Sequence, residues 1–286
     1  PRPSRPRDGV RLLDTSSVRT VGGLFARLVE PGALQRAVDR SARGKRQRGD
    51  VAAFLLTRDL HVAHLRAALE AGTWRPAGFT LMPVRDPKPR LIARAPFADR
   101  VIHTALVDAL WPAFAPSLTD DDFACRPPSR DRRWGTHRAV LQLQALMRRH
   151  RYALHLDVRS YFPSVDPDRV LGLVARRVRD ARLLAVLAAV LESGRGLYDT
   201  PWVRRFARFD PGWPPPGRGL PVGASTSQFL ASHVYLMGLD HWVKRDLHVP
   251  GYLRYADDMF IFADRRADLR RWRGAVKGWL ADERDL

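Results

Sequence analysis

Two adjacent carboxylates, Asp257 and Asp258, lie between two short runs of aromatic and aliphatic residues. The runs cover residues 251–255 and 259–263, consist mostly of strand-forming residues and are flanked by turn signals. This pattern predicts a β-hairpin with Ala256-Asp257-Asp258 near its tip. Neighbouring acidic side chains repel each other and form strands poorly, so we expect positive charge beside them. A solvated turn is the simpler interpretation, but the apolar second run favours a hairpin buried in a sheet.

A divalent cation needs oxygen ligands from more than one element, which calls for a third carboxylate on a neighbouring strand. Segment 152–158 alternates, so that Leu154, Leu156 and Val158 face one way and Asp157 faces the other. Asp157 therefore ends a half-buried strand, on the face opposite the core leucines. One carboxylate that ends a strand and two in a later hairpin form the layout of a polymerase palm, where two metal ions serve in-line displacement.

Three ordered motifs resemble those of reverse transcriptases, from roughly residue 35 to the end of the sequence. Tyr255-Ala256-Asp257-Asp258 matches the Tyr-x-Asp-Asp box of the family, Asp157 with Phe162 matches its first palm motif, and 219–228 matches the next. Most of the family has Gln-Gly-x-x-x-Ser-Pro there, whereas this sequence has Val-Gly-x-x-x-Ser-Gln. This variant is similar to the enzymes of diversity-generating retroelements, which copy RNA with frequent errors at adenines. Related bacterial reverse transcriptases share parts of it.

The resemblance implies an α+β fold, the fingers and palm of a right-hand polymerase, with an antiparallel palm sheet packed with helices. We expect residues 1–20 to form a flexible basic arm, 21–150 the fingers and N-terminal helices, and 151–286 the palm. A fingers segment is expected to return at about 167–222. The family's thumb is missing from this sequence, and we expect low processivity for the chain as it stands.

The resemblance also assigns roles to residues. Asp157, Asp257 and Asp258 are the expected catalytic residues, and with the carbonyl of Val158 they would hold two Mg²⁺ ions, for which Mn²⁺ is a substitute. The residues expected to bind the nucleotide are Arg90, Lys88, Phe162, Val222, Gly223 and Gln228. Those expected to bind nucleic acid are Tyr255, Arg126, Arg130, Arg132, Arg133 and Arg138.

Several of these roles have a physical reason and a simpler alternative. The Arg90 guanidinium matches phosphate geometry, although it and Lys88 are also typical of exposed strand charges. Phe162 would exclude a 2′-hydroxyl, or be a core residue. Val222 replaces a hydrogen-bonding Gln beside the nucleotide, which would loosen base-pair checking. Gly223 would let a nucleotide approach.

Charge and composition agree with a polyanion partner. Lys plus Arg number 49 against 30 for Asp plus Glu, a net charge of +19 that favours nucleic acid. The five arginines of segment 126–138 surround Trp134, a pattern that favours single strands. A single cysteine excludes a disulfide framework and a Cys-based zinc site. No apolar run approaches membrane-spanning length, so we expect a cytoplasmic protein with no membrane contact.

The remaining patterns predict the elements that position these residues. A hairpin is expected from 79–84 and 90–94, and a helix from about 225 to 247 capped by Ser225 or Thr226. Residues 197–216 look too irregular for a core element, and the acidic run 120–122 is interpreted as a loop rather than a metal site. Further helices are expected at 24–39 (two), 51–71, 97–114, 139–149, 167–178, 181–192 and 267–282.

The expected activity is RNA-directed DNA synthesis, with an RNA template, a DNA or RNA primer and deoxynucleoside triphosphates as partners. Members of the resembled branch also work with a small basic accessory protein. Two alternatives stay open: a defence-associated or template-independent reverse transcriptase, and a non-catalytic RNA-binding module that kept the polymerase fold. The intact aspartates argue against the second.

Overall fold

The computed structural model describes residues 20–85, 89–126 and 134–286. The expected basic arm, apart from residue 20, lies outside the described residues, as do Lys88, Arg130, Arg132 and Arg133.

Three N-terminal helices pack against a long apolar helix, α5 (Phe97–Phe114), whose bounds match the expected ones, and a fourth packs against those three. They are α1 (Leu24–Val29), α2 (Pro31–Ala42), α3 (Gly49–Leu56) and α4 (Arg58–Glu70), and a 3-10 turn, Ala115–Ser117, follows α5. The single helix expected over 51–71 is wrong, because the backbone leaves the helical region at Thr57. Leu60, near the start of α4, is 55% exposed.

A two-stranded hairpin, β1 (Thr80–Val84) with β2 (Arg90–Arg94), confirms the expected antiparallel pair. Leu91 packs in an apolar cluster with Tyr198 and Val203. Segment 197–216 is therefore more ordered than expected: it contains α10 (Pro201–Phe206). The aromatic residues of this segment are irregularly spaced, so the sequence pattern did not indicate that they pack against the hairpin.

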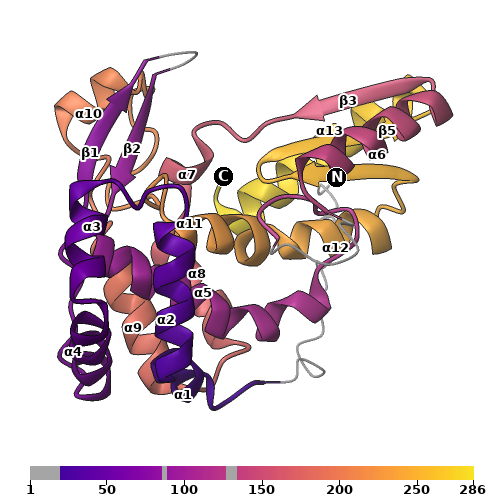
Figure 1. Cartoon of the computed structure of the whole chain (residues 1–286). Coiled ribbons are helices and arrows are strands. Elements are labelled where there is room, and N and C mark those ends of the chain that lie inside the picture. The colour runs from indigo at the N-terminus through magenta and orange to yellow at the C-terminus, as the bar shows by residue number, and fades with distance from the viewer. Residues whose placement is uncertain (1–19, 86–88, 127–133) are drawn as a thin grey trace, which may run out of the picture.

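A three-stranded antiparallel sheet forms the other side of the molecule (Figure 1). Its order is β3 (Tyr152–Leu156), β5 (Asp258–Ala263), β4 (Gly251–Tyr255). Helix α6 (Thr136–Arg149) packs against one face through a cluster that includes Leu146 and Phe262. Helix α13 (Arg266–Arg284) packs against the other. The strands expected around the acidic pair are confirmed, and so is the buried setting of the hairpin.

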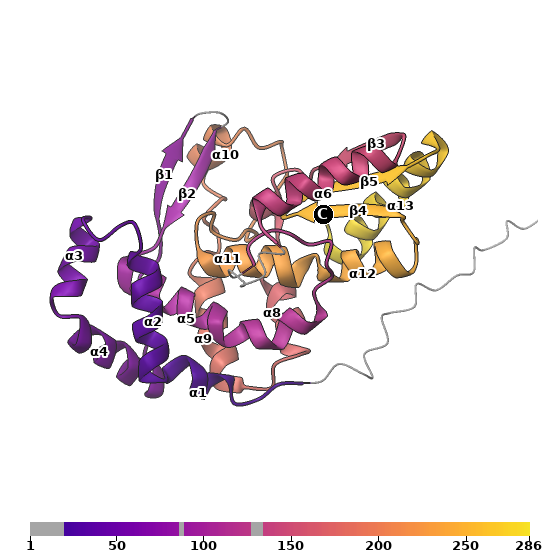
Figure 2. The same cartoon turned by 45° about the vertical axis from the view of Figure 1, so that its right-hand side comes forward.

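Helices link the hairpin to the sheet (Figures 1 and 2). They are α7 (Tyr161–Ser164), α8 (Pro167–Ala175), α9 (Ala181–Glu192), α11 (Ser225–Phe229), a π-helix (Leu230–Tyr235) and α12 (Met237–Arg245). The continuous helix expected over 225–247 is thus divided. Its expected cap is also wrong, since Ala224 precedes α11 and Thr226 is buried, with its hydroxyl 3.4 Å from His103 Nδ1. Among the described residues, no helix combines the length and apolarity needed to cross a membrane.

Candidate active site

The acidic hairpin closes with the shortest loop that joins two antiparallel strands. Tyr255 pairs with Asp258, so Ala256 and Asp257 form the loop. Such two-residue loops need a positive φ, which is why glycine and asparagine are common in them. Ala256 adopts φ 58° without being either, so neighbouring groups must hold this turn.

Asp157 lies at the same end of the sheet as this turn. Leu156 is the last residue of β3 and pairs with Met259, so the next positions along are Asp157 and Asp258. The alternation expected for β3 is confirmed, since Leu154 and Leu156 pack against the core and Asp157 is exposed. The register of β3 against β5 thus brings together carboxylates a hundred positions apart in sequence.

The carboxyl group of Asp157, just after β3, lies near that of Asp257 in the β4–β5 loop. Burial, together with the charges of Asp157 and Asp258, raises the pKa of Asp257 to about 6. The neighbouring carboxylates disfavour the charged form of Asp257. An oxygen-only group of this kind fits a hard divalent cation, whose positive charge would favour the ionised form.

Asp258, unlike the other two aspartates, contacts a histidine side chain. Its Oδ1 lies 2.7 Å from Nε2 of His155, whose ring stacks on Phe260 at 4.5 Å between centroids. Among the residues that the structure describes, no group of three His, Cys, Asp or Glu side chains is arranged to hold a metal ion. Sequence reasoning missed His155, although its place on the Asp157 face of β3 was a usable signal.

A buried charge cluster lies behind the turn. Arg254 has no exposed side-chain surface and pairs with two equally buried carboxylates, Asp240 at 2.6 Å and Asp122 at 3.0 Å. His233 Nδ1 lies 2.8 Å from Asp122. Burial alone would lower the pKa of Arg254, but Asp122 and Asp240 outweigh it and raise that pKa.

This cluster corrects two expectations. Arg254 supplies a positive charge near the acidic pair, as expected, but this charge is paired with Asp122 and Asp240. The acidic run 120–122 is not a simple loop, because Asp122 forms a parallel β-bridge with Arg254.

The motif that contains Val222 is tied to β2. The carbonyl of Val222 accepts from the Ala93 amide at 2.7 Å, and its amide donates to the Tyr198 hydroxyl at 3.2 Å. Gly223 has φ +108°, and a Cβ there would lie 3.1 Å from Ile92. Contact with β2 is thus a structural reason for this glycine.

The other expected site residues are dispersed. Arg90 is exposed at the start of β2 and forms no ion pair with a described residue, Gln228 is exposed on α11, and Phe162 is half-buried on α7. Arg126 stacks on Trp134 at 4.3 Å and donates to the Thr119 carbonyl. The Tyr255 hydroxyl lies 2.8 Å from that of Thr136. Arg138 is exposed on α6. Arg126 and Tyr255 therefore make contacts within the chain.

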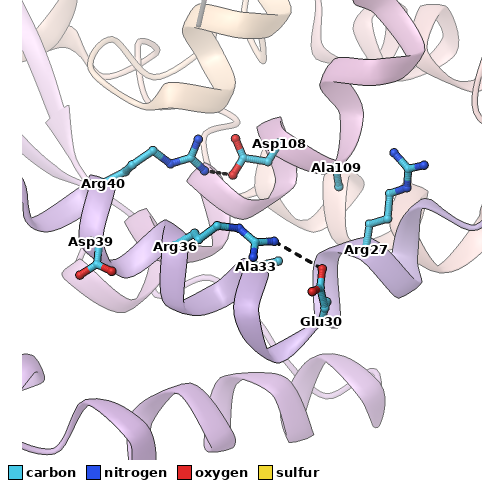
Figure 3. A pocket seen from close by; sticks show the side chains of 8 residues that line it. All are labelled: Arg27, Glu30, Ala33, Arg36, Asp39, Arg40, Asp108 and Ala109. Atoms are coloured by element: carbon cyan, nitrogen blue, oxygen red, sulfur yellow. Dashed lines mark hydrogen bonds and ion pairs between the residues drawn. The ribbon is translucent and has the colours of Figure 1, made fainter. Parts of the chain in front are cut away.

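A surface pocket of about 720 Å³ lies between α1, α2 and α5, which carry none of the aspartates above (Figure 3). Its charges largely satisfy one another. Arg40 pairs with Asp108, and Arg36 lies 3.4 Å from Glu30. The pocket is a charged surface depression rather than a second reaction centre.

Comparison with known families identifies the fold. The sequence model of the family "Reverse transcriptase (RNA-dependent DNA polymerase)" matches residues 83–285, which is most of the chain and includes all three aspartates. The chain belongs to the reverse transcriptase family. Its helices and small antiparallel sheets agree with the α+β, polymerase-like architecture expected for a reverse transcriptase.

More distant comparisons add little. No curated protein sequence matches this reverse transcriptase chain. A solved chain described as a partial Cas6-RT-Cas1–Cas2 complex is similar at 19% identity with a TM-score of 0.46. The similarity covers 91% of this chain and 43% of the other, so the present chain spans less than half of that protein.

The raised pKa of Asp257 predicts a pH-dependent cost to stability. Its folded-state value of about 6 exceeds the ordinary 3.8, so the folded protein binds this proton more tightly and loses stability as pH rises from about 4 to about 6. Asp257→Asn does not titrate. We expect it to melt above wild type in metal-free buffer at pH 8, with the difference vanishing towards pH 4.

Thermal melting of both proteins between pH 4 and pH 8 measures this difference, and a constant difference across the range would contradict the prediction. Mg²⁺ should raise the melting temperature of wild type but not that of Asp257→Asn, because a ligand stabilises only a folded protein that binds it.

Proposed function

We propose that this chain is the polymerase portion of a reverse transcriptase that adds deoxynucleotides to a primer on an RNA template. The observation that carries the proposal is that Asp157, just after β3, and Asp257, in the β4–β5 loop, lie at the same end of the sheet. Membership of the reverse transcriptase family supports it. A binding module would gain nothing from a buried carboxyl at this position, because burial and the neighbouring carboxylates disfavour the charged form of Asp257.

The domain arrangement follows from this proposal. The sheet β3-β5-β4 with residues 151–286 would be the palm, and the hairpin β1–β2 with the helices of residues 21–150 would be the fingers. The segment 167–222 returns to the hairpin through Tyr198 and Val222, which supports its assignment to the fingers.

The chemistry assigned to the site uses oxygen ligands. Asp157 and Asp257 would hold two Mg²⁺ ions, with Mn²⁺ as a substitute, assisted by the Val158 carbonyl and by Asp258. Bound there, the ions would stabilise negative charge on the attacking and leaving oxygens. The chain's own groups orient the substrates: Arg90 would pair with the triphosphate, and the Phe162 ring would exclude a 2′-hydroxyl.

Nucleic acid would be bound mainly through its backbone, because base pairing supplies the sequence choice. The net charge of +19 supports this mode. Arg138, and Arg130, Arg132 and Arg133 outside the described residues, are proposed contacts, whereas Arg126 and Tyr255 would act through contacts within the chain. We place the reaction in the cytoplasm, with a small basic protein as an accessory partner.

Primer extension on a mixed-sequence RNA, with Mg²⁺ and all four deoxynucleotides, tests the proposal. Products complementary to the template are expected. Products of unrelated sequence would instead favour template-independent synthesis. RNA binding without any extension would favour the non-catalytic module.

We further propose that copying is error-prone, as in diversity-generating retroelements, because Val222 offers no hydrogen bond beside the incoming base. Val222→Gln is expected to lower misincorporation at template adenines. The backbone of residue 222 is fixed by Ala93 and Tyr198, so the substitution should change the side chain alone. Sequencing the cDNA measures the error rate. Val222→Ala, which stays apolar, is the control, and an error spectrum unchanged in Val222→Gln would refute the role.

A further inference from the structure

The peptide group between Ala256 and Asp257 is held from behind by a buried arginine. Arg254 donates from Nη1 to the carbonyl of Ala256 at 2.9 Å. The rest of its guanidinium is held by acidic groups: Nε and Nη2 donate to the two oxygens of Asp240 at 2.7 and 2.6 Å, and Nη2 lies 3.0 Å from Asp122. A guanidinium whose N–H groups are held by this many partners is fixed in one orientation.

The main chain of Arg254 is fixed as well. Its amide donates to the carbonyl of Asp121 at 2.8 Å, and its carbonyl accepts from the amide of Phe123 at 3.0 Å. Tyr252 also donates to Asp240 at 2.8 Å. The guanidinium is therefore anchored to a segment more than a hundred positions away in sequence as well as to α12.

One trans peptide links this anchor to the candidate active site. In a planar trans peptide the C=O and the N–H point in opposite directions, so holding the Ala256 carbonyl also aims the Asp257 amide. The Cα of Asp257 follows directly after this amide, so the orientation of the peptide group also sets where the Asp257 side chain begins. The left-handed conformation of Ala256 costs about 1–2 kcal/mol in a residue other than glycine, so the turn would relax without the arginine.

We propose that Arg254 is a positioning residue for the reaction: anchored by Asp122 and Asp240, it orients the Ala256–Asp257 peptide and through it the Asp257 carboxylate. This inference rests on the proposed function, in which Asp257 is a metal ligand. A purely structural Arg254 would stabilise the sheet without affecting the chemistry of the turn.

Arg254→Lys is the variant that separates these roles, because it keeps the charge and loses the fork. Arg284→Lys is its matched control. Arg284 is also buried and donates to main-chain carbonyls, those of Tyr235 and Glu283, but it does not contact the turn. Both variants should lower the melting temperature. Only Arg254→Lys should lower kcat, by about 10²-fold for a displaced catalytic group, with little change in KM for deoxynucleotides.

Binding of Mn²⁺, followed by electron paramagnetic resonance without substrates, gives a readout independent of activity. Weaker binding in Arg254→Lys than in Arg284→Lys supports the proposal. A folded Arg254→Lys with wild-type kcat and wild-type Mn²⁺ affinity overturns it. If wild type extends no primer, the proposed function fails, and the Mn²⁺ comparison still decides the role of Arg254.

A second variant covers the case in which Arg254→Lys does not fold. Asp240→Asn keeps the shape of the anchor and leaves Arg254 paired with Asp122, so it should remain folded. We expect kcat to fall by about 10-fold, as for other groups that orient a metal ligand. An unchanged kcat and Mn²⁺ affinity in folded Asp240→Asn would overturn the proposal.

Discussion

Asp257→Asn is expected to abolish primer extension, lowering kcat by at least about a thousandfold. The substitution keeps the shape of the side chain and removes the charge that a divalent cation needs. Metal ions contribute several kcal/mol of charge stabilisation in the transition state, and each 1.36 kcal/mol is a factor of ten in rate. Single-turnover extension of a labelled primer on RNA, with saturating Mg²⁺, measures the loss. Asp157→Asn should behave in the same way.

Asp264→Asn is the matched control for this experiment. Asp264 follows the far end of β5, is well exposed, and accepts from the Arg151 amide at 3.1 Å. Its substitution should leave kcat near the wild-type value. If Asp257→Asn keeps substantial activity while Asp264→Asn behaves like wild type, the assignment of Asp257 as a metal ligand is wrong. Asp258→Asn should have a smaller effect than Asp257→Asn, since Asp258 is engaged by His155.

Arg254→Met is expected to cause the largest loss of stability, about 3–5 kcal/mol. Removing one partner of a buried ion pair leaves the other charge uncompensated in the interior. Here two fully buried carboxylates, Asp122 and Asp240, would lose the same cation. For a chain of this size the loss corresponds to a drop in melting temperature of roughly 10 °C. Urea unfolding followed by circular dichroism measures the free energy directly.

A triple variant tests whether charge, rather than packing, causes that loss. Arg254→Met combined with Asp122→Asn and Asp240→Asn leaves no ionised group of the cluster without its partner, and neutral replacements of buried ion pairs are often tolerated. The triple variant should therefore be more stable than Arg254→Met alone. A triple variant as unstable as the single one would show that the loss comes from packing around the arginine.

Local patterns in the sequence were enough to predict several parts of this protein. The alternation around Asp157 and the apolar runs around Asp257 indicated three strands, and all three pair in one antiparallel sheet. The spacing of apolar residues in 97–114 gave α5 with its observed bounds. The ordered motifs indicated the reverse transcriptase family, and the match over residues 83–285 confirms it. Periodicity and motif spacing are local properties, so they can be recognised before folding.

The contacts between groups distant in sequence became visible in the folded structure alone. The run 120–122 gives no local signal that Asp122 is the buried partner of Arg254, because that pairing depends on a β-bridge between segments more than a hundred residues apart. The engagement of Asp258 by His155 likewise depends on the register of β3 against β5. The order in 197–216 depends on packing against the hairpin. Long-range packing and burial fix these contacts, and neither can be recognised in a local stretch of sequence.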